Sequence, residues 1–560
     1  MIELFFNTVL TNAVIFAYGI LASIYVFNEK ISKNNISEIP LFGIIFISFL
    51  TLILNFFIPI NKIIGTIILI FGLLFLVKVM AFNSKVYKKI IKNISISSII
   101  TIILLSYSNI YRPDAGLYHL PYLSLVNDNK IVIGAANINF RFAINSIAQY
   151  LSASQNNYIY NQASISIPLA SAFSFSIIFM IKKIFEKIKI NKTLISTSIF
   201  LISIFCLLSF GRFSNYGNDA ISHLYFFILV IFILADYERI KFDYLKLNKI
   251  ALLSIFLFTT KAFMFLIIAI PFIFFITFKN KKKLLLSRFH FINSVLLIAW
   301  LLKSVIISGC IIYPINETCF KSLKIHDENK VIFESKSGEA WAKGWINQKK
   351  EILDFAEYNK NFNWVATWKI VHLKKIIEKL TPYLIFLQLF LLLLVFQKKE
   401  SLKIKKKEIS FVFFISIILC IIWFLKFPLY RYGSAFLVNA IIILFIYMIY
   451  YLNLIPKKNT LIKNFKIFIL ICSIAFLTKN FLRIHENSNI FNNKIWPDIY
   501  SEKNDYKKNK FALIKDKNNN DLYYFSSGKL CMYSQSPCSN YKIQNLYKEN
   551  FFSYELYWVK

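Results

Sequence analysis

Residues 112–146 read RPDAGLYHLPYLSLVNDNKIVIGAANINFRFAINS and form a polar segment in a chain that is otherwise strongly apolar. The segment begins a few residues after an apolar stretch at 91–107. An apolar stretch of that length is what a membrane-spanning helix requires. We therefore expect residues 112–146 to lie in a loop at a membrane boundary, and we expect the chemistry of the chain to be concentrated there.

The composition of the whole chain indicates a polytopic membrane protein. Of its 560 residues, 57% are hydrophobic and 18% are aromatic, and the mean hydropathy is +0.56. Soluble domains average about 45–50% apolar residues. The net charge of +36 reflects basic residues clustered between apolar stretches. Such clusters are typical of topology signals and of contact with anionic lipid, so we expect no nucleic-acid partner.

The spacing of the apolar stretches predicts about fourteen membrane-spanning or hairpin helices. Full spans are predicted at 4–27, 41–59, 63–82, 91–107, 160–181, 193–210, 219–236, 289–307, 379–397, 409–427, 433–454 and 467–481. The stretch 249–278 is too long for one crossing and too short for two. It predicts a tight helical hairpin with its tip near Thr260–Lys261.

Clusters of basic residues orient these spans, because loops rich in Lys and Arg stay in the cytoplasm. The clusters are Lys85 to Lys92, Lys182 to Lys192, Arg239 to Lys246, Lys279 to Arg288, Lys398 to Lys407 and Lys457 to Lys466. The resulting alternation places both termini and the segments 108–159, 211–218, 308–378, 428–432 and 482–560 outside the cytoplasm.

Three regions follow from this topology, in an all-α polytopic membrane protein. N-terminal transmembrane helices occupy residues 1–90. A membrane domain at 91–481 carries two outer loops, 108–159 and 308–378. Residues 482–560 form an extracytoplasmic C-terminal domain, whose polar, Tyr-rich text predicts a small β-rich cap.

The cysteines and tryptophans divide by location. Inside apolar stretches, Cys206, Cys420 and Cys472 are expected to be core residues. In the outer polar segments, the pairs Cys310/Cys319 and Cys531/Cys538 are candidate disulfides, although four cysteines allow three connectivities and free thiols are the alternative. The outer loop 308–378 contains Trp341, Trp345, Trp364 and Trp368, which we expect in an interfacial aromatic belt.

Three residues of the opening segment have the spacing of one small pocket. Asp114 lies at the predicted outer boundary, where a partly desolvated carboxylate can act as a general base. Tyr118 and His119 follow four and five residues later, so one helical turn would gather all three. The alternatives are a loop aspartate without function and a histidine that anchors the chain at the interface.

Further polar residues lie on the same predicted side. Arg141 and Asn145 are four residues apart, which would place them on one helix face, and Arg141 is suited either to clamp an anion or to be solvated. Asp219 begins a span in GRFSNYGNDAISHL, near Arg212 and His223. An aspartate at a helix N-terminus is more often a cap than a catalyst.

Two cations stand out because they lie at or between spans. Lys261 is at the predicted hairpin tip, where the hairpin offers no acid, so we expect it to bind a lipid phosphate or to snorkel to the outer interface. Arg431, in WFLKFPLYRYG, lies between two spans on the outer side. Lys78 and Lys303, each near the end of a span, are expected to snorkel.

Several common catalytic motifs are absent from the sequence. The chain has no P-loop, no G-x-G-x-x-G, no H-E-x-x-H and no C-x-x-C pair. This argues against a nucleotide-driven pump, a dinucleotide enzyme and a zinc protease. No soluble domain is predicted in the cytoplasm, which disfavours an enzyme that uses a cytoplasmic nucleotide sugar.

Over most of residues 91–435, the chain resembles the GT-C superfamily of integral membrane glycosyltransferases. Asp114 of PDAGLYHLP matches the catalytic aspartate in the first large outer loop of that superfamily. Asp219 matches the second outer acidic position, and Lys261 matches the polar tip of the short hairpin. SGCIIYP matches a G-x-x-x-Y-P turn.

Two other motifs extend the resemblance. Arg431 and Tyr432 match a P-x-x-R-Y element late in the membrane domain. GAANINFRFAINS, at 134–146, is similar to a little-characterised bacterial branch of these proteins.

The resemblance implies an inverting transferase in a bacterial plasma membrane, with its site facing the periplasm or exterior. The donor would be a polyprenyl-phosphate-linked sugar and the acceptor a cell-envelope glycan or lipid. Implied catalytic residues are Asp114, His119 and Asp219. Implied residues for binding substrate and lipid phosphate are Tyr118, Arg141, Asn145, Lys261, Arg431 and Tyr432.

Two departures from the superfamily leave its use of a metal and its substrate open. Asp114 is followed by Ala-Gly and not by a second acid, and three extra helices precede the catalytic loop. If a metal is bound, Asp114 and Asp219 are the expected ligands, and oxygen ligands would favour Mg²⁺ or Mn²⁺.

Three rival functions account for part of the pattern. A lipid-linked glycan flippase or other transporter would explain Lys261 and Arg431 without a base. An O-antigen-type polymerase would use pyrophosphate-linked glycans. A non-catalytic scaffold for surface assembly is the third.

Overall fold

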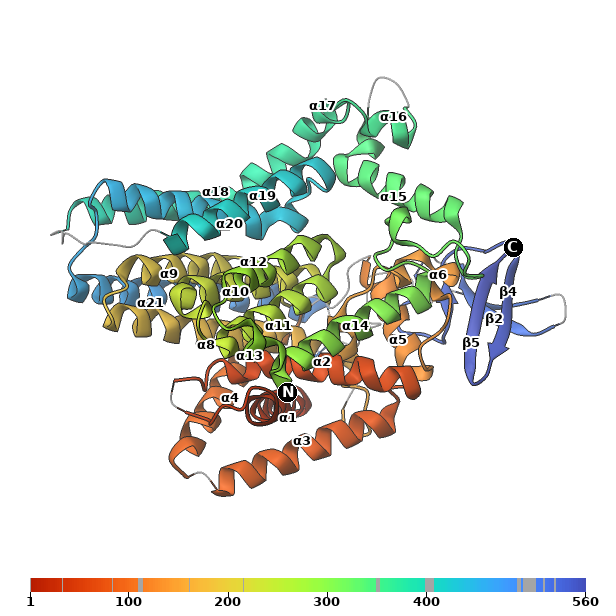
Figure 1. The fold of residues 1–560 in the computed structure, drawn as a ribbon, viewed down its shortest axis with the longest axis horizontal. Helices are drawn as coiled ribbons and strands as arrows, with labels where there is room; N and C mark the ends of the chain where they lie inside the picture. The colour runs from red at the N-terminus through yellow and green to blue at the C-terminus, as the bar shows by residue number, and fades with distance from the viewer. Residues whose placement is uncertain are drawn as a thin grey trace.

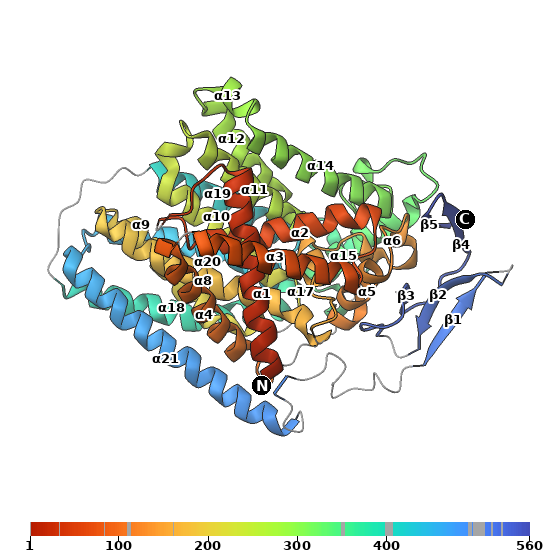
Figure 2. The same cartoon turned by 90° about the horizontal axis from the view of Figure 1, so that it is seen from below.

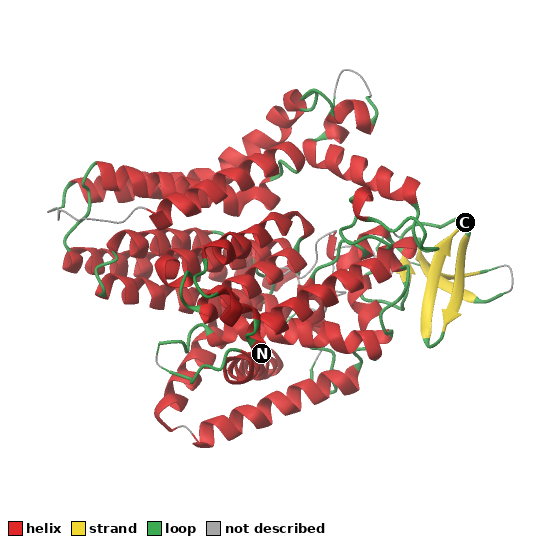
Figure 3. Ribbon diagram, in the orientation of Figure 1, coloured by secondary structure: helices red, strands yellow, loops and turns green. Residues whose placement is uncertain are grey.

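A computed structural model describes residues 2–32, 34–82, 84–108, 114–160, 162–214, 216–348, 353–397, 407–490, 495–496, 510–516, 519–527 and 530–560. The fold is mostly helical, with a small β region near the C-terminus (Figure 1, Figure 3). The predicted class is therefore confirmed at this level: a mostly helical fold with candidate membrane-spanning helices and a small sheet region near the C-terminus.

Ten helices of the described chain are long and apolar enough to cross a membrane. They are Ile2–Val26, Ile39–Phe57, Lys62–Ala81, Gln162–Lys189, Asp219–Ile240, Arg288–Ser308, Val365–Val395, Lys407–Lys426, Tyr430–Tyr451 and Lys458–Asn489. The predicted number of about fourteen is not confirmed, in part because Thr193–Leu208 and Ala262–Thr277 are apolar but shorter. Most of the predicted basic cluster at 398–407 lies outside the described residues.

The helices follow one another in these bounds. The first four are α1 (Ile2–Leu21), α2 (Ile39–Phe57), α3 (Lys62–Phe82) and α4 (Ser84–Leu105). The loop 108–159, which is predicted to lie outside the cytoplasm and which we call the first outer segment, contains α5 (Leu120–Asp128), α6 (Ala135–Ile138) and α7 (Ile147–Ala153). The central helices are α8 (Ile167–Lys189), α9 (Thr193–Leu208), α10 (Asp219–Ile240), α11 (Tyr244–Thr260), α12 (Ala269–Thr277), α13 (Lys281–Leu285) and α14 (Arg288–Ser308).

The predicted outer loop 308–378, which we call the second outer segment, contains α15 (Glu328–Lys343), α16 (Phe355–Asn359) and α17 (Val365–Trp368). It is followed by α18 (Lys374–Val395), α19 (Lys407–Lys426), α20 (Tyr430–Tyr451) and α21 (Lys458–Ile490). Helix α21 runs along one side of the molecule (Figure 2).

The predicted hairpin forms, and it breaks at the predicted place. Helix α11 ends at Thr260, Lys261 has extended backbone with φ −149° and ψ 123°, and a 3₁₀ stretch, Ala262–Ile268, leads into α12. Both following segments pack back against α11. The break places Lys261 at a junction of helical segments, within reach of the start of α10.

The C-terminal region folds into two small sheets. Strands β1 (Phe511–Lys515) and β2 (Asp521–Ser526) pair antiparallel, and β3 (Cys538–Ser539) pairs parallel to β2. Strands β4 (Leu546–Phe551) and β5 (Tyr554–Val559) form an antiparallel hairpin. The strands lie at one end of the molecule, beside α5 and α6 (Figure 1, Figure 2). We call residues 510–516, 519–527 and 530–560 the cap.

Backbone hydrogen bonds attach the cap to the first outer segment. The N–H of Ile133 donates to the carbonyl of Glu555 at 2.9 Å, and the N–H of Tyr557 donates to the carbonyl of Ile133 at 2.8 Å. The N–H of Met532 donates to the carbonyl of Gly116 at 2.9 Å. The cap is therefore fixed to the same stretch of chain that contains Asp114.

Both candidate disulfides form. Cys310 is bonded to Cys319, and Cys531 is bonded to Cys538. The second bond closes the loop that holds Met532 against Gly116. Of the other cysteines, Cys206 is buried, and Cys420 and Cys472 are half-buried.

The predicted aromatic belt is wrong for two of the tryptophans. Trp364 and Trp368 are 2% and 8% exposed, and the indole N–H of Trp368 donates to the carbonyl of Pro428 at 2.7 Å. Trp364 also lies against Phe424, with ring centroids 5.2 Å apart. These rings join the second outer segment to the end of α19. Packing within the protein buries their apolar surface and gives the indole N–H of Trp368 a hydrogen-bond acceptor, so they do not lie at the membrane–water interface.

Docking of the cap can be tested at Gly134. Its φ is +71°, and a Cβ there would lie 1.9 Å from the carbonyl oxygen of Tyr557. We expect Gly134→Ala to lower the free energy of unfolding by roughly 1–3 kcal/mol and to expose the cap to protease. Limited proteolysis of the purified protein measures this. Gly338→Ala is the control, because a Cβ there meets nothing within 4 Å; equal resistance of both variants would contradict the docking.

Candidate functional site

The helical turn predicted for the first outer segment is present. Asp114 is the N-cap of a π-helical turn, Ala115–His119, which runs directly into α5. The rings of Tyr118 and His119 lie with their centroids 4.2 Å apart. The wide turn thus gathers an acid, a phenol and an imidazole within six residues of chain.

Arg431, at the start of α20, forms an ion pair with Asp114. Its Nη1 lies 2.7 Å from Oδ2 of Asp114, and its Nη2 donates to the hydroxyl of Tyr432 at 2.9 Å. The guanidinium also lies over the rings of Tyr432 and Trp341, at 4.9 and 5.3 Å. The side chains of the pair are 37% and 36% exposed, and Nε of Arg431 is buried without a hydrogen-bond partner in the described part of the chain. The pair can therefore meet a further ligand.

Lys261 forms a second ion pair, with Asp219. Its Nζ lies 2.7 Å from Oδ1 of Asp219, in the first turn of α10. The hairpin offers Lys261 no acid, as the sequence indicates, but the expectation that Lys261 is unpaired is wrong, because the acid comes from a different helix. The side chains are 17% and 23% exposed, so this pair is more enclosed than that of Asp114.

Tyr432 joins the two ion pairs into one site. Its hydroxyl accepts from Arg431, and Nζ of Lys261 lies 5.8 Å from the centre of its ring. The site thus combines the first outer segment, the start of α10, the hairpin tip and the start of α20. Four segments far apart in sequence meet there.

His119 lies in this site as a neutral donor. It is 4% exposed, and its Nδ1 faces the amide groups of Asn218 and Gln149 at 3.1 and 3.4 Å. An amide NH₂ donates, so Nδ1 accepts and Nε2 carries the proton. Burial, with a contribution from Lys261, lowers the pKa of His119 to about 3. The alternative of an interface anchor is wrong, because the ring is buried.

Arg212 and His223 hold the backbone of Arg431 and Tyr432 in place by hydrogen bonds. The Nη1 of Arg212 donates to Nδ1 of His223 at 2.9 Å, so Nε2 of His223 carries a proton and donates to the carbonyl of Tyr432 at 3.0 Å. Arg212 Nη2 donates to the carbonyl of Arg431 at 3.3 Å. The sequence placed these two residues near Asp219, but their contact with residues 431–432 needed the fold.

Arg141 and Asn145 do not share a helix face. Arg141 lies in a 3₁₀ turn, Phe140–Phe142, and its guanidinium lies 5.2 Å from the centre of the Tyr118 ring. Asn145 follows that turn, is 5% exposed, and accepts a hydrogen bond from Nζ of Lys303. Arg141 therefore reaches the site through Tyr118, whereas the side chain of Asn145 is engaged by Lys303.

Lys303 does not snorkel. It is 0% exposed, and its Nζ lies 4.1 Å from the centre of the Trp300 ring. Lys78 is exposed, which is compatible with snorkelling. The prediction is wrong at Lys303 because α14 packs against α6 of the first outer segment. This packing buries Lys303 within the protein.

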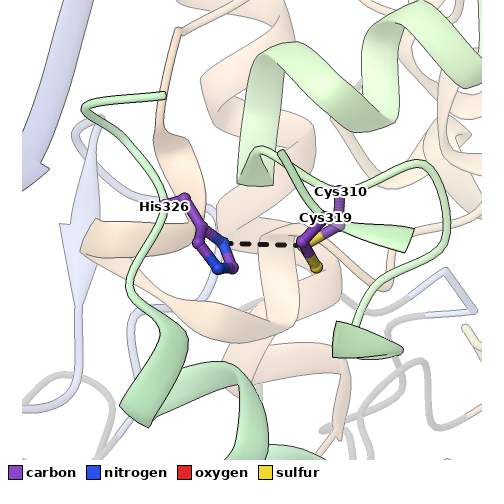
Figure 4. Close-up of side chains that lie close together, drawn as sticks. All are labelled: Cys310, Cys319 and His326. Atoms are coloured by element: carbon purple, nitrogen blue, oxygen red, sulfur yellow. Dashed lines mark hydrogen bonds between the residues drawn. A yellow bond between two sulfur atoms is a disulfide. The ribbon is translucent and has the colours of Figure 1, made fainter. Parts of the chain in front are cut away.

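The described residues contain one group whose ligand atoms could hold a metal ion: Cys310, Cys319 and His326 (Figure 4). Its two sulfurs are joined to each other, so no thiolate is available there. Asp114 and Asp219 are each engaged by a cationic side chain. Binding of Mg²⁺ or Mn²⁺ by these two acids stays a prediction, and it would require both cations to move.

Coupling within the second ion pair can be measured by a double-mutant cycle. Removing one partner leaves the other charge enclosed and unpaired, so Asp219→Asn and Lys261→Met should each cost about 3 kcal/mol of unfolding free energy. The double variant should lose clearly less than the sum. Thermal unfolding in detergent provides the comparison, and additive losses would show that the two side chains do not interact.

The neutral state of His119 predicts a pH dependence of stability. Its pKa falls from an ordinary 6.5 to about 3, so the unfolded chain binds the proton more readily than the folded protein. The stability from this group is complete above about pH 6.5 and is lost at up to about 1.4 kcal/mol per pH unit as the pH falls. Thermal unfolding of His119→Gln should vary less with pH between about 7 and 4. His485→Gln, at an exposed position, should match wild type; the same pH slope in all three proteins would refute the assignment.

Comparisons with known proteins locate the chain in one family. Searches of the curated proteins and of the solved structures give no match. A family model described as "Domain of unknown function (DUF8201)" matches residues 1–438. The matched range contains all four residues of the two ion pairs, and it ends before α21 and the cap. The chain therefore belongs to the DUF8201 family.

Proposed function

We propose that this protein is an integral membrane glycosyltransferase of the GT-C type. It transfers a sugar from a polyprenyl-phosphate donor to a cell-envelope glycan or lipid on the extracytoplasmic face of a bacterial plasma membrane. The observation that carries the proposal is the meeting of two acids and two cations at the start of α10 and α20, with Asp114 paired to Arg431 and Asp219 paired to Lys261.

The phosphate of the donor is suited to Arg431. The guanidinium presents a planar set of donors that fits a phosphate, and its Nε has no partner among the described residues. A bound phosphate would compete with Asp114 for Nη1, because both are anions. Binding of the donor thus releases the carboxylate of Asp114 from its ion pair.

The released carboxylate then acts as the general base. Asp114 takes the proton of an acceptor hydroxyl, and the hydroxyl oxygen forms a bond to the anomeric carbon of the donor sugar. The bond from that carbon to the phosphate oxygen breaks, and its electron pair leaves with polyprenyl phosphate. A single displacement of this kind inverts the anomeric configuration.

The cations stabilise the charge that develops on the leaving phosphate. Arg431 acts directly, and Lys261 adds its charge from the neighbouring ion pair. In this account Asp219 holds the ammonium of Lys261 in place and is not a second base. His119 is neutral and acts as a hydrogen-bond donor, since its Nδ1 is already engaged.

Two features favour an enzyme over a flippase. A site that only binds a lipid-linked carrier would bind its phosphate most tightly with cations that form no ion pair with an acidic residue. Here both cations form an ion pair with a carboxylate. The more exposed carboxylate, Asp114, also lies close in the chain to Tyr118, whose half-buried phenol keeps its proton because burial raises its pKa. A base and a donor side by side suit proton transfer.

The test is transfer of sugar by the purified protein in lipid. With a panel of radiolabelled polyprenyl-phosphate sugars and cell-envelope lipid as acceptor, Asp114→Asn should reduce transfer by about 10²- to 10⁴-fold, because the amide cannot accept the proton. Asp128→Asn is the matched control: it lies in the same outer segment, and its carboxylate accepts from Ser124 at 3.2 Å. Wild-type turnover by Asp114→Asn would refute the role of this residue.

A further inference from the structure

A second polar cluster lies beside the ion pairs, and the proposed mechanism does not use it. It brings together Arg141 of the first outer segment, Glu334 of α15 and Tyr541 of the cap. The backbone N–H of Arg141 and the hydroxyl of Tyr541 both donate to Oδ1 of Asn139, at 3.1 and 3.0 Å. One turn before Glu334, Nζ of Lys330 donates to the carbonyl of Ala136 at 3.2 Å and holds α15 against the first outer segment. Three outer parts of the molecule thus converge on one place.

The charged groups of this cluster lack partners among the described residues. The guanidinium of Arg141 lies over the rings of Tyr118 and Phe140, at 5.2 and 5.3 Å, and makes no ion pair or hydrogen bond with a described residue. The carboxyl of Glu334 is half-buried and likewise has no hydrogen bond within the described ranges. Burial raises its pKa to about 6. Five N–H donors and one carboxyl therefore remain available at the same place.

Two buried neutral groups point to a ligand more strongly. Tyr313 is 4% exposed and Asn139 is 1% exposed, yet the hydroxyl of Tyr313 and the Nδ2 of Asn139 have no hydrogen-bond partner in the described chain. The hydroxyl of Tyr541 donates to Oδ1 of Asn139 at 3.0 Å, so the amide faces the cap. Burial raises the pKa of Tyr313, and the charges of Glu334 and Tyr541 raise it further. Buried polar groups without partners are rare.

The chemistry of the cluster selects a hydroxyl-rich ligand. Arg141 and Nδ2 of Asn139 only donate, Glu334 accepts, and the tyrosine hydroxyls do both. Adjacent hydroxyls of a sugar ring can satisfy all of these groups at once, because each hydroxyl is a donor and an acceptor. Aromatic rings alongside such groups also suit the apolar face of a sugar.

We propose that Arg141, Glu334, Tyr313 and Tyr541 bind a saccharide ring of the acceptor. The assignment of that saccharide as acceptor rests on the proposed function, whereas saccharide binding itself does not. In this proposal the cap contributes to ligand binding, because it supplies Tyr541. The hydrogen bond from Met532 to Gly116 holds the cap in place.

Tyr118 connects this cluster to the ion pairs. The guanidinium of Arg141 lies 5.2 Å from the centre of its ring. The pKa of its phenol, which burial raises, is also affected by the charges of Lys261 and Asp114. In this proposal, a saccharide held by Arg141 and Glu334 directs one hydroxyl past Tyr118 toward Asp114. Proton removal by Asp114 needs that placement.

Binding can be measured on the full-length protein without any donor. The probes are methyl glycosides of neutral hexoses, amino sugars and uronic acids, and the readout is saturation-transfer NMR with titration to an apparent Kd. Wild type should bind at least one glycoside. Glu334→Gln, Arg141→Gln and Tyr541→Phe should each weaken binding of that glycoside by about 10- to 100-fold, the loss expected for one hydrogen bond to a charged or buried group.

Two controls separate this proposal from the proposed function. Glu328→Gln changes another carboxylate of α15, one that pairs with Lys321 at the surface, and should bind as wild type does. The second control is a transfer assay on the same preparation of wild type. Intact binding with no transfer by wild type would refute the function alone. Absence of binding by every glycoside, or unchanged affinity in all three cluster variants, would overturn the saccharide site.

Discussion

The ion pair between Asp114 and Arg431 joins positions 317 residues apart in the chain. A charge at a membrane boundary is costly without a partner, so the start of α20 and the first outer segment must meet. The same constraint brings the hairpin tip to α10 through Lys261 and Asp219. Arg212 and His223 then hold the backbone of residues 431–432 from behind. The arrangement of the hairpin tip and of the starts of α10 and α20 depends on these few charges.

Features set by neighbouring residues could be predicted from the sequence. The helical turn at Asp114–His119, the break at Lys261 and both disulfides depend on short spacings, and all of them are present. The membrane-spanning character followed from composition, although the number of spans did not. Orientation relative to the cytoplasm still rests on the charge pattern.

Features set by distant partners could not be predicted. The acid of Lys261 comes from another helix, Lys303 is covered by the first outer segment, and Trp364 packs within the protein instead of at an interface. A single sequence carries no signal for such contacts, because each of these side chains is equally compatible with contact to lipid, to water or to another part of the protein. The cap illustrates the same limit: its strands were expected, but its attachment at Gly116 and its contribution of Tyr541 beside Arg141 were not.

The central claim is that Arg431 binds a polyprenyl phosphate beside Asp114. Native mass spectrometry of the purified protein with added polyprenyl phosphate measures this directly. The account predicts retention of the lipid by wild type and loss of about tenfold or more in affinity for Arg431→Gln, because a charge-assisted hydrogen bond is removed. Arg239→Gln, at an exposed position, should retain the lipid. Equal retention by all three proteins would contradict the account.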